Sequence, residues 1–308
     1  MFQNKLRNMT RTKNSIIVFF SSKTDRFTIE YCDHQRWVIS KDKVSQLIPD
    51  SMASLLRTAK SASDWKQNDL RTYNIVVRNV DPCSFFGREP TNLPESIESF
   101  RVAHHWQDVD DNFTMNLLRM LWFASGDDLA RESAVDDFMM TLFVAIGYTS
   151  RTRFARSRRR LSLIVCGEYR QATPDICLLD DQTTILLVQE DKSYVSDTDP
   201  EPQLIAEAIG AFQENDTLRR RMSRPIRDHV TIPGITMRGT FPVFYRIEVT
   251  SELADAVAAG IYPPHETVVL SCAPPCRPEL SGTISGMRDL EFREVALKYF
   301  EAFKQFID

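Results

Sequence analysis

Three ionisable residues near the middle of the chain have types and spacing that could carry out chemistry: Asp175, Glu190 and Lys192. They lie in two apolar stretches, DICLL and TTILLVQEDK, which are separated by a short polar segment and therefore predict a β-hairpin. If the turn is centred just after Gln182, Asp175 lies directly opposite Glu190, with the two Cβ atoms about 5 Å apart. Strand alternation then places Lys192 on the same face. The spacing thus predicts two carboxylates and one ammonium group that converge.

Two carboxylates at this separation repel each other, and each resists ionisation unless a positive charge compensates. A divalent cation compensates directly, since Mg²⁺ prefers carboxylate oxygens as ligands and retains bound water. Such an ion lowers the pKa of its bound water and stabilises negative charge on a phosphoryl oxygen. We expect Lys192 to orient that water or to neutralise the developing charge. The alternative is that these residues are ordinary solvated charges at strand ends.

Glu132 and Gln203 are further candidates, on the helices expected before and after the hairpin. Glu132 shares one helical face with five apolar residues: Val135, Met139, Leu142, Phe143 and Ile146. A buried glutamate without a partner is costly, so Glu132 is expected to meet a metal ion, a metal-bound water or an arginine. Alternatively, it lies at an exposed helix start, which suits the helix dipole, and Asp136 is the competing acid. Gln203 begins the later helix on its more polar face, where we expect it to position the site.

Two arginine-rich segments flank these residues in the sequence. Residues 151–160 contain six arginines and residues 219–227 contain five. A groove that follows nucleic-acid phosphates needs such clusters. We expect five of these side chains to contact nucleic acid: Arg158, Arg159, Arg160, Arg219 and Arg220. The alternative is a solvated basic face, and the formal net charge of −4 argues weakly against non-specific nucleic-acid binding.

The order of the expected elements predicts an α/β fold with a mixed sheet. A helix over about 128–148 precedes strands over 160–167, 175–179 and 183–192, a helix over 202–215 and a strand over 241–250. An amphipathic helix over 294–307 closes the chain. The turn-rich stretch 81–96 marks the expected boundary between a small α+β N-terminal region, residues 1–95, and the main domain, residues 96–308.

Composition bounds the partners and the location of the protein. No run of about eighteen apolar residues occurs, so we expect no membrane partner. The apolar stretch Ile16–Phe20 is too short for a signal-peptide core and is followed by charge, so we expect an intracellular protein, cytoplasmic or nuclear. Cys272 and Cys276 form the one suggestive cysteine pair, without further ligands at zinc spacing. The sequence leaves oligomer formation possible.

These residues together resemble the PD-(D/E)XK nuclease superfamily over about 127–250. Pro174-Asp175 and the Glu190-x-Lys192 motif match its central signature, Glu132 is similar to its first-helix acid, and Gln203 is similar to a helix glutamine of several branches. The resemblance implies a restriction-endonuclease-like core, with a mixed four-stranded sheet flanked by helices. It also implies a Mg²⁺- or Mn²⁺-dependent endonuclease of DNA or RNA, with Asp175, Glu190 and Glu132 as metal ligands. Three segments, QEDK (189–192), DPEPQLIAEAIGAFQ (199–213) and PGITMRGTFPVFYRIEV (233–249), also resemble a set of proteins common in mushroom-forming fungi, and this resemblance extends from about residue 80 onward.

Two function classes therefore remain after the sequence is considered. The first is a metal-dependent nuclease that hydrolyses phosphodiester bonds. The second is a catalytically inactive module that keeps the nuclease fold and binds nucleic acid or a protein partner. The net negative charge and the extra acid Asp191 beside the expected site favour the second class.

Overall fold

The structure, a computed structural model, describes most of the chain after residue 56 and the backbone of three strands before it. The described residues are 17–21, 26–30, 36–40, 57–95, 97–126, 131–181, 183–190, 199–280 and 285–307, without the side chains of 131, 132 and 190. The three N-terminal strands form an antiparallel sheet in the order of their sequence: β1 (Ile17–Ser21), β2 (Arg26–Glu30) and β3 (Arg36–Ser40).

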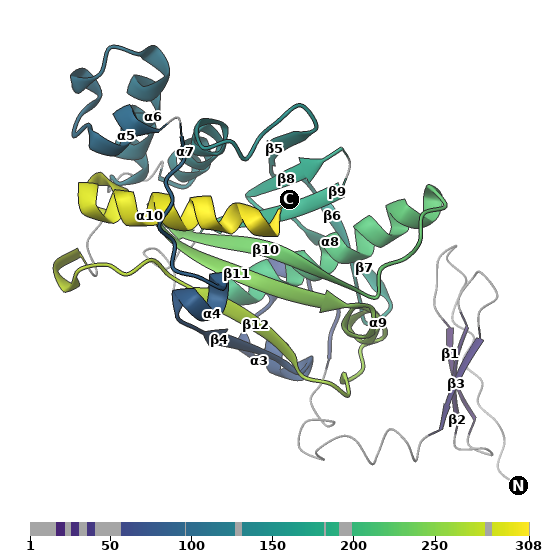
Figure 1. Cartoon of the computed structure of the whole chain (residues 1–308). Helices are drawn as coiled ribbons and strands as arrows, with labels where there is room; N and C mark the ends of the chain where they lie inside the picture. The colour runs from purple at the N-terminus through teal and green to yellow at the C-terminus, as the bar shows by residue number, and fades with distance from the viewer. Residues whose placement is uncertain are drawn as a thin grey trace, which may run out of the picture.

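The remaining described residues build a mixed seven-stranded sheet, which we call the main sheet (Figure 1). From one edge to the other its strands are β4 (Ile75–Asn79), β12 (Thr267–Cys272), β11 (Phe241–Thr250), β10 (His229–Arg238), β9 (Thr183–Glu190), β8 (Ile176–Asp180) and β5 (Arg153–Ser157). Two neighbouring pairs are parallel, β9 with β10 and β12 with β4, and the others are antiparallel. The expected α/β fold with a mixed sheet is confirmed, and the sheet is wider than the four strands that we expected.

Helices cover both faces of the main sheet and divide its core into two layers (Figure 1). One layer contains α4 (Pro82–Phe86), α5 (Glu98–Val102), α6 (Asn112–Ala124), α7 (Arg131–Ala145) and α10 (Leu290–Phe303). The other contains α3 (Gln67–Thr72), α8 (Glu201–Arg221) and α9 (Ser251–Ala259). We call them the α7 layer and the α8 layer.

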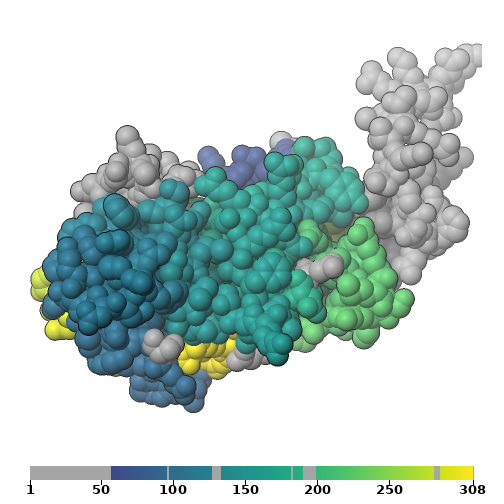
Figure 2. All heavy atoms as spheres, turned by 90° about the horizontal axis from the view of Figure 1, so that it is seen from above, coloured from purple at the N-terminus to yellow at the C-terminus, as the bar shows by residue number. Residues whose placement is uncertain are grey.

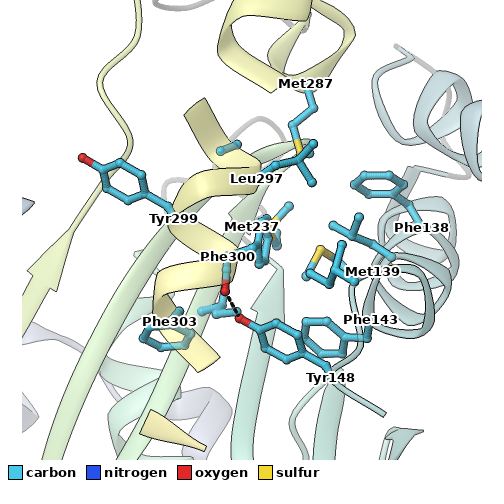
Figure 3. Close-up of a cluster of buried hydrophobic side chains, with 14 of the residues drawn as sticks. Phe138, Met139, Phe143, Tyr148, Met237, Met287, Leu297, Tyr299, Phe300 and Phe303 are labelled. Carbon is cyan, nitrogen blue, oxygen red and sulfur yellow. Dashed lines mark hydrogen bonds between the residues drawn. The ribbon is translucent and has the colours of Figure 1, made fainter. Parts of the chain in front are cut away.

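The α7 layer is rich in aromatic and sulfur-containing side chains, as Figure 3 shows. Phe143 stacks on Tyr148 with ring centroids 4.7 Å apart. The Tyr148 hydroxyl donates a hydrogen bond to the Phe300 carbonyl oxygen, 2.7 Å away. A buried tyrosine needs such an acceptor, so this bond fixes α10 against the segment that follows α7.

Strands β8 and β9 pack on helices from both faces, which explains why each is a nearly continuous apolar run. In β8, Ile176 and Leu178 enter the α7 layer, whereas Cys177 and Leu179 enter the α8 layer. A bulge interrupts the pairing with β9 between Leu178 and Leu179. This bulge decides which side chains of the two strands meet.

The strand expected over 160–167 lies outside the main sheet. It forms β6 (Leu161–Val165), which pairs only with β7 (Glu168–Ala172) and packs across α8. The two elements are in ordinary van der Waals contact at Gly210 of α8, where a Cβ would lie 3.5 Å from the Cβ of Leu163. The edge of the main sheet is instead β5, which comes from the first arginine-rich segment.

Strand β4 lies before residue 95, where we expected a boundary, and joins the main sheet. It pairs in parallel with β12, from Ile75 with Thr267 to Asn79 with Ser271. The main sheet therefore includes a strand from the N-terminal side of the expected boundary. Figure 2 shows the α5–α6 region (blue) and the green residues that follow α8 toward opposite ends of the molecule.

Candidate functional site

Asp175 directly precedes β8, and its partner on β9 is Gln189. The Nε2 of Gln189 donates a hydrogen bond to Asp175 Oδ2 over 2.6 Å. The register agrees, since Ile176 pairs with Val188 and one further step brings Asp175 opposite Gln189. The predicted direct pairing of Asp175 with Glu190 is therefore wrong, and so is their predicted position on one face, because strand alternation in this register assigns positions 175 and 190 to opposite faces of the sheet.

The error in register has a local cause in the hairpin. Asp180 pairs with Thr183, so the turn is tighter than the one that we expected. Ile185 is then an extra residue on β9, because Leu179 pairs with Thr184 while Leu178 pairs with Leu186. The tighter turn shifts the pairing by two residues, and the extra residue shifts it back by one. The pairing at Asp175 is therefore one residue away from the predicted register.

Gln203 connects this pair to a buried acid on α8. Its Nε2 donates to Gln189 Oε1 over 2.9 Å and to Glu207 Oε1 over 3.0 Å. We call the four residues Asp175, Gln189, Gln203 and Glu207 the polar chain. It links two carboxyl groups through two amides between the main sheet and α8. Gln203 is thus linked to Asp175 through Gln189.

Glu207 is the most buried ionisable member of the polar chain, with 0 % of its surface exposed. Burial raises the pKa of its carboxyl well above the ordinary value, and the negative charge of Asp175 raises it further. Its Oε2 is buried and finds no hydrogen-bond partner among the described residues. Both observations favour the protonated form, because an unpaired buried carboxylate is far more costly than a neutral acid.

Further polar groups continue this band across the neighbouring strands. Thr236 of β10 is in register with Gln189, and its hydroxyl donates to the Tyr245 hydroxyl of β11 over 3.5 Å. The pKa of Tyr245 is raised by burial and by the negative charge of Glu201 at the start of α8. Polar side chains therefore extend from Asp175, just before β8, across β9, β10 and β11 beneath the first half of α8.

The remaining predicted site residues are Glu132, Glu190 and Lys192. Glu132 lies at the start of α7 and Glu190 at the end of β9, and their side chains, like all of Lys192, lie outside the described residues. The apolar face predicted for α7 is confirmed, since its five residues are all buried in the α7 layer: Val135, Met139, Leu142, Phe143 and Ile146. The structure thus brings together Asp175 and Gln203, and leaves the rest of the predicted set untested.

The donor atoms of the polar chain are all oxygen or amide groups, which suits a hard divalent cation better than a soft one. Two carboxyl groups are among them, and one oxygen of Glu207 is an orphan. In the part of the chain that the structure describes, no three His, Cys, Asp or Glu residues are grouped so that they could hold a metal ion. A complete ligand set would need residues 190–192 or Glu132.

The arginines were expected to bracket Asp175, and the structure separates most of them from it. The backbone N–H of Arg158 donates to the Asp175 carbonyl oxygen over 2.8 Å, so this residue does adjoin the site. The guanidinium of Arg159 instead donates to Thr184 Oγ1 at 2.7 Å and to Glu214 Oε1 at 2.6 Å. Both partners lie near the beginning of β9 or the later half of α8, away from Asp175.

The direction of α8 explains this separation. Gln203, in its first turn, bonds to Gln189 near the end of β9, whereas Asn215 bonds to the backbone of Thr184 near the beginning of β9. The helix therefore runs antiparallel to β9. Arg219 is sixteen residues beyond Gln203, which corresponds to about 24 Å along the helix axis. The second arginine cluster thus lies at the opposite end of α8 from the polar chain.

Gln189 and Glu207 are the two members that the sequence analysis missed. Glu207 follows Gln203 by four residues, so the helical period alone places both on one face. Gln189 directly precedes Glu190, and a register one residue shorter would have identified it. Neither signal distinguishes a site residue from a packing residue without the three-dimensional contacts.

Among the described residues, no helix combines the length and the apolar character that crossing a bilayer requires. No family model and no curated protein matches this sequence.

Proposed function

We propose that this chain is a divalent-metal-dependent nuclease that hydrolyses phosphodiester bonds of DNA or RNA. The observation that carries the proposal is the placement of Asp175, whose carboxylate is held by Gln189 at the end of a buried polar chain. Burying the amide of Gln189 and the acid of Glu207 costs desolvation free energy, which packing alone does not require. A site that must hold the carboxylate of Asp175 in one orientation accounts for this cost.

The topology around Asp175 supports the same proposal. The chain passes in order through α7, β5, β8, β9, α8 and β10, with the small β6–β7 hairpin inserted after β5. The four strands are neighbours, with β5, β8 and β9 antiparallel and β10 parallel to β9. We propose that this unit is the restriction-endonuclease-like core and that β11, β12 and β4 extend it.

The proposed metal ligands are Asp175, Glu190 and Glu132, with Mg²⁺ or Mn²⁺ as the ion. Because the register assigns positions 175 and 190 to opposite faces, their carboxylates would share an ion only around the end of β9, where Glu190 stands. When bound, the ion would lower the pKa of a water molecule and stabilise charge on the phosphoryl oxygens. Gln189 holds the Asp175 carboxylate in one orientation, and Gln203 holds Gln189 in turn. Such supporting hydrogen bonds reduce the freedom of a ligating carboxylate. Lys192 is the proposed group that neutralises negative charge at the reacting phosphate.

A second candidate function is a nuclease-fold module that binds nucleic acid or a protein without cleaving. The observation in its favour is that an uncharged amide, and not Glu190, stands opposite Asp175. A neutral partner satisfies Asp175 Oδ2 without any metal ion. Titration with Mn²⁺ separates the two candidates, because the second requires no metal site at Asp175.

A cleavage panel tests the leading proposal. Single- and double-stranded DNA and RNA would be incubated with the full chain in Mg²⁺ or Mn²⁺ at low salt. We expect cleavage by the unmodified chain, a loss of roughly a hundredfold or more in Asp175→Asn, and normal cleavage in Asp180→Asn. Asp180 is an exposed acid at the other end of β8, so it is a matched control. Absence of cleavage on every substrate would overturn the proposal.

A further inference from the structure

A small cavity lies at the end of the main sheet where the parallel strands β9 and β10 begin, which we call the hairpin end. Its volume is about 160 Å³. Its polar wall includes Thr183 of β9, Thr231 of β10 and the two arginines Arg219 and Arg227. The lining also includes apolar side chains, among them Phe212 of α8. Because a water molecule occupies about 30 Å³ in the liquid, the cavity has room for one small oxyanion.

The arginines at the hairpin end are unevenly supplied with carboxylate partners. Arg220 pairs with Asp216 over 2.9 Å. In the described part of the chain, four others form no ion pair with a carboxylate: Arg219, Arg221, Arg224 and Arg227. A helix C-terminus favours basic residues, which accounts in part for positions up to 221. It does not account for positions 224 and 227, which lie beyond the end of α8.

The first arginine-rich segment reaches the same end of the sheet. Arg153 Nη1 donates to the carbonyl oxygen of Ile307, which lines the cavity, over 3.5 Å. Arg159 donates to Thr184, another lining residue, and pairs with Glu214. Two segments that are some sixty residues apart in the sequence thus converge on one cavity.

Acidic residues at the hairpin end reduce its positive potential without neutralising these arginines. Glu214 pairs with Arg159. Asp216, which also lines the cavity, pairs with Arg220 through Oδ2, whereas its buried Oδ1 has no hydrogen-bond partner among the described residues. Asp180, Asp181 and Asp228 are exposed, and no ion pair joins them to the four arginines named above. The cavity therefore keeps guanidinium groups that an external anion can engage.

We propose that the hairpin end binds a phosphate group of a nucleic acid, with Arg219 and Arg227 as the direct contacts. Guanidinium groups donate paired hydrogen bonds that match phosphate oxygens, and the threonine hydroxyls provide further donors. The exposed residues Arg221 and Arg224 extend the basic surface beyond the cavity, which suits a polymer with repeated phosphates better than a single small anion. The choice of a nucleic acid rests on the proposed function, whereas the phosphate chemistry stands on the cavity alone.

The same geometry specifies the length of nucleic acid that would reach both ends of α8. About 24 Å of helix separates Gln203 from Arg219. One strand of a duplex advances about 3.4 Å per nucleotide, so the two ends are about seven nucleotides apart. A nucleic acid held at the hairpin end would therefore be cut about seven nucleotides away from that contact.

Binding measured without cleavage tests the proposal. The probes are a labelled DNA duplex of about 16 base pairs, roughly twice the span above, and an RNA duplex of the same sequence, in EDTA. Affinity is followed against salt concentration for the full chain and for Arg219→Ala/Arg227→Ala. Each lost phosphate contact lowers the slope of log affinity against log salt by about one, so we expect a decrease of about two. Inorganic phosphate should compete with the probe in the unmodified chain.

Two further variants make the outcome decisive. Arg88→Ala/Arg119→Ala removes the same charge from exposed arginines elsewhere and should leave the slope unchanged. Arg224→Ala/Arg227→Ala avoids the half-buried Arg219, whose Nε bonds to the Pro225 carbonyl, and should also lower the slope.

An unchanged slope in both hairpin-end variants would overturn the proposal. So would arginine-dependent binding to anionic lipid vesicles with none to either duplex. Retained binding with no cleavage in Mn²⁺ would refute only the nuclease function.

Discussion

The two ends of α8 differ in burial, in charge and in the kind of hydrogen bond that they form. At the Asp175 end, acids and amides are joined in a buried chain. At the hairpin end, Arg219 and Arg227 line a small cavity, and neither forms an ion pair with a carboxylate in the part of the chain that the structure describes. Screening by physiological salt acts over about 8 Å, which is far less than the length of α8. The arginines of the second cluster are therefore too far from Asp175 to neutralise its carboxylate.

This difference suggests that one end of α8 performs chemistry and the other holds the substrate. Asp175→Ala should lower the single-turnover cleavage rate by roughly a hundredfold or more at saturating nucleic acid. It should leave the affinity measured in EDTA unchanged. Arg219→Ala/Arg227→Ala should do the opposite, raising KM while preserving kcat, because it removes binding alone. Equal losses of rate at saturation in both variants would contradict the division.

Loss of the amide support should have the next largest effect. Gln189→Leu removes the donor to Asp175 and the acceptor of Gln203, so cleavage should fall about 10- to 100-fold, as for other residues that support metal ligands. Affinity at the hairpin end should not change. Gln171→Leu, at an exposed position of β7, is the matched control. A full cleavage rate in Gln189→Leu would show that the polar chain is only structural.

Packing beneath the first half of α8 should be less tolerant than packing at its middle. A Cβ at Gly234 would lie 2.9 Å from Leu204 Cδ2 and 3.2 Å from Ile247 Cδ1 in the α8 layer. Gly234→Ala should therefore lower the free energy of unfolding by about 1–3 kcal/mol. Gly210→Ala meets only ordinary contacts and replaces a helical glycine, so it should raise that free energy by about 0.5–1 kcal/mol. Chemical denaturation measures both, and the reverse order would contradict this packing.

Glu207 should give stability a pH dependence that Glu207→Gln lacks. Because its folded pKa is raised, the folded chain binds this proton more tightly than the unfolded chain. Its stabilising contribution is complete below the ordinary glutamate pKa and is lost as pH rises through the raised value. The difference in unfolding free energy between the two proteins should change by at most about 1.4 kcal/mol per pH unit.

Glu279→Gln, at an exposed position, serves as the control for that titration. Its difference from the unmodified chain should stay flat over the same range of pH. If the difference in unfolding free energy for Glu207→Gln is also independent of pH, Glu207 ionises normally in the folded chain. That result would contradict the raised pKa that the burial of its carboxyl implies.

The sequence predicted the parts of this arrangement that depend on local pattern. The apolar face of α7, the hairpin around Asp175 and the position of Gln203 in the first turn of α8 follow from helical and strand periods. The register does not, because the bulge at Ile185 depends on packing against two helical layers. The tight turn shifts the pairing by two residues and the bulge restores one of them, so Gln189 and not Glu190 stands opposite Asp175.

Non-local pairing accounts for the other differences from expectation. Strand β4 joins the main sheet through β12, almost two hundred residues later, and no local pattern near residue 75 indicates this. Strand β5 was interpreted only as a basic segment, since arginines at a sheet edge resemble a solvated cluster. The convergence of both arginine clusters at the hairpin end likewise depends on the antiparallel course of α8 against β9.

Mn²⁺ binding tests most directly whether the Asp175 end is a catalytic metal site. Free Mn²⁺ would be measured by electron paramagnetic resonance during titration of the full chain, Asp175→Asn and Asp180→Asn. The account predicts that the unmodified chain and Asp180→Asn bind Mn²⁺ alike and that Asp175→Asn loses that binding. Equal Mn²⁺ binding in Asp175→Asn, or none in any of the three proteins, would contradict it.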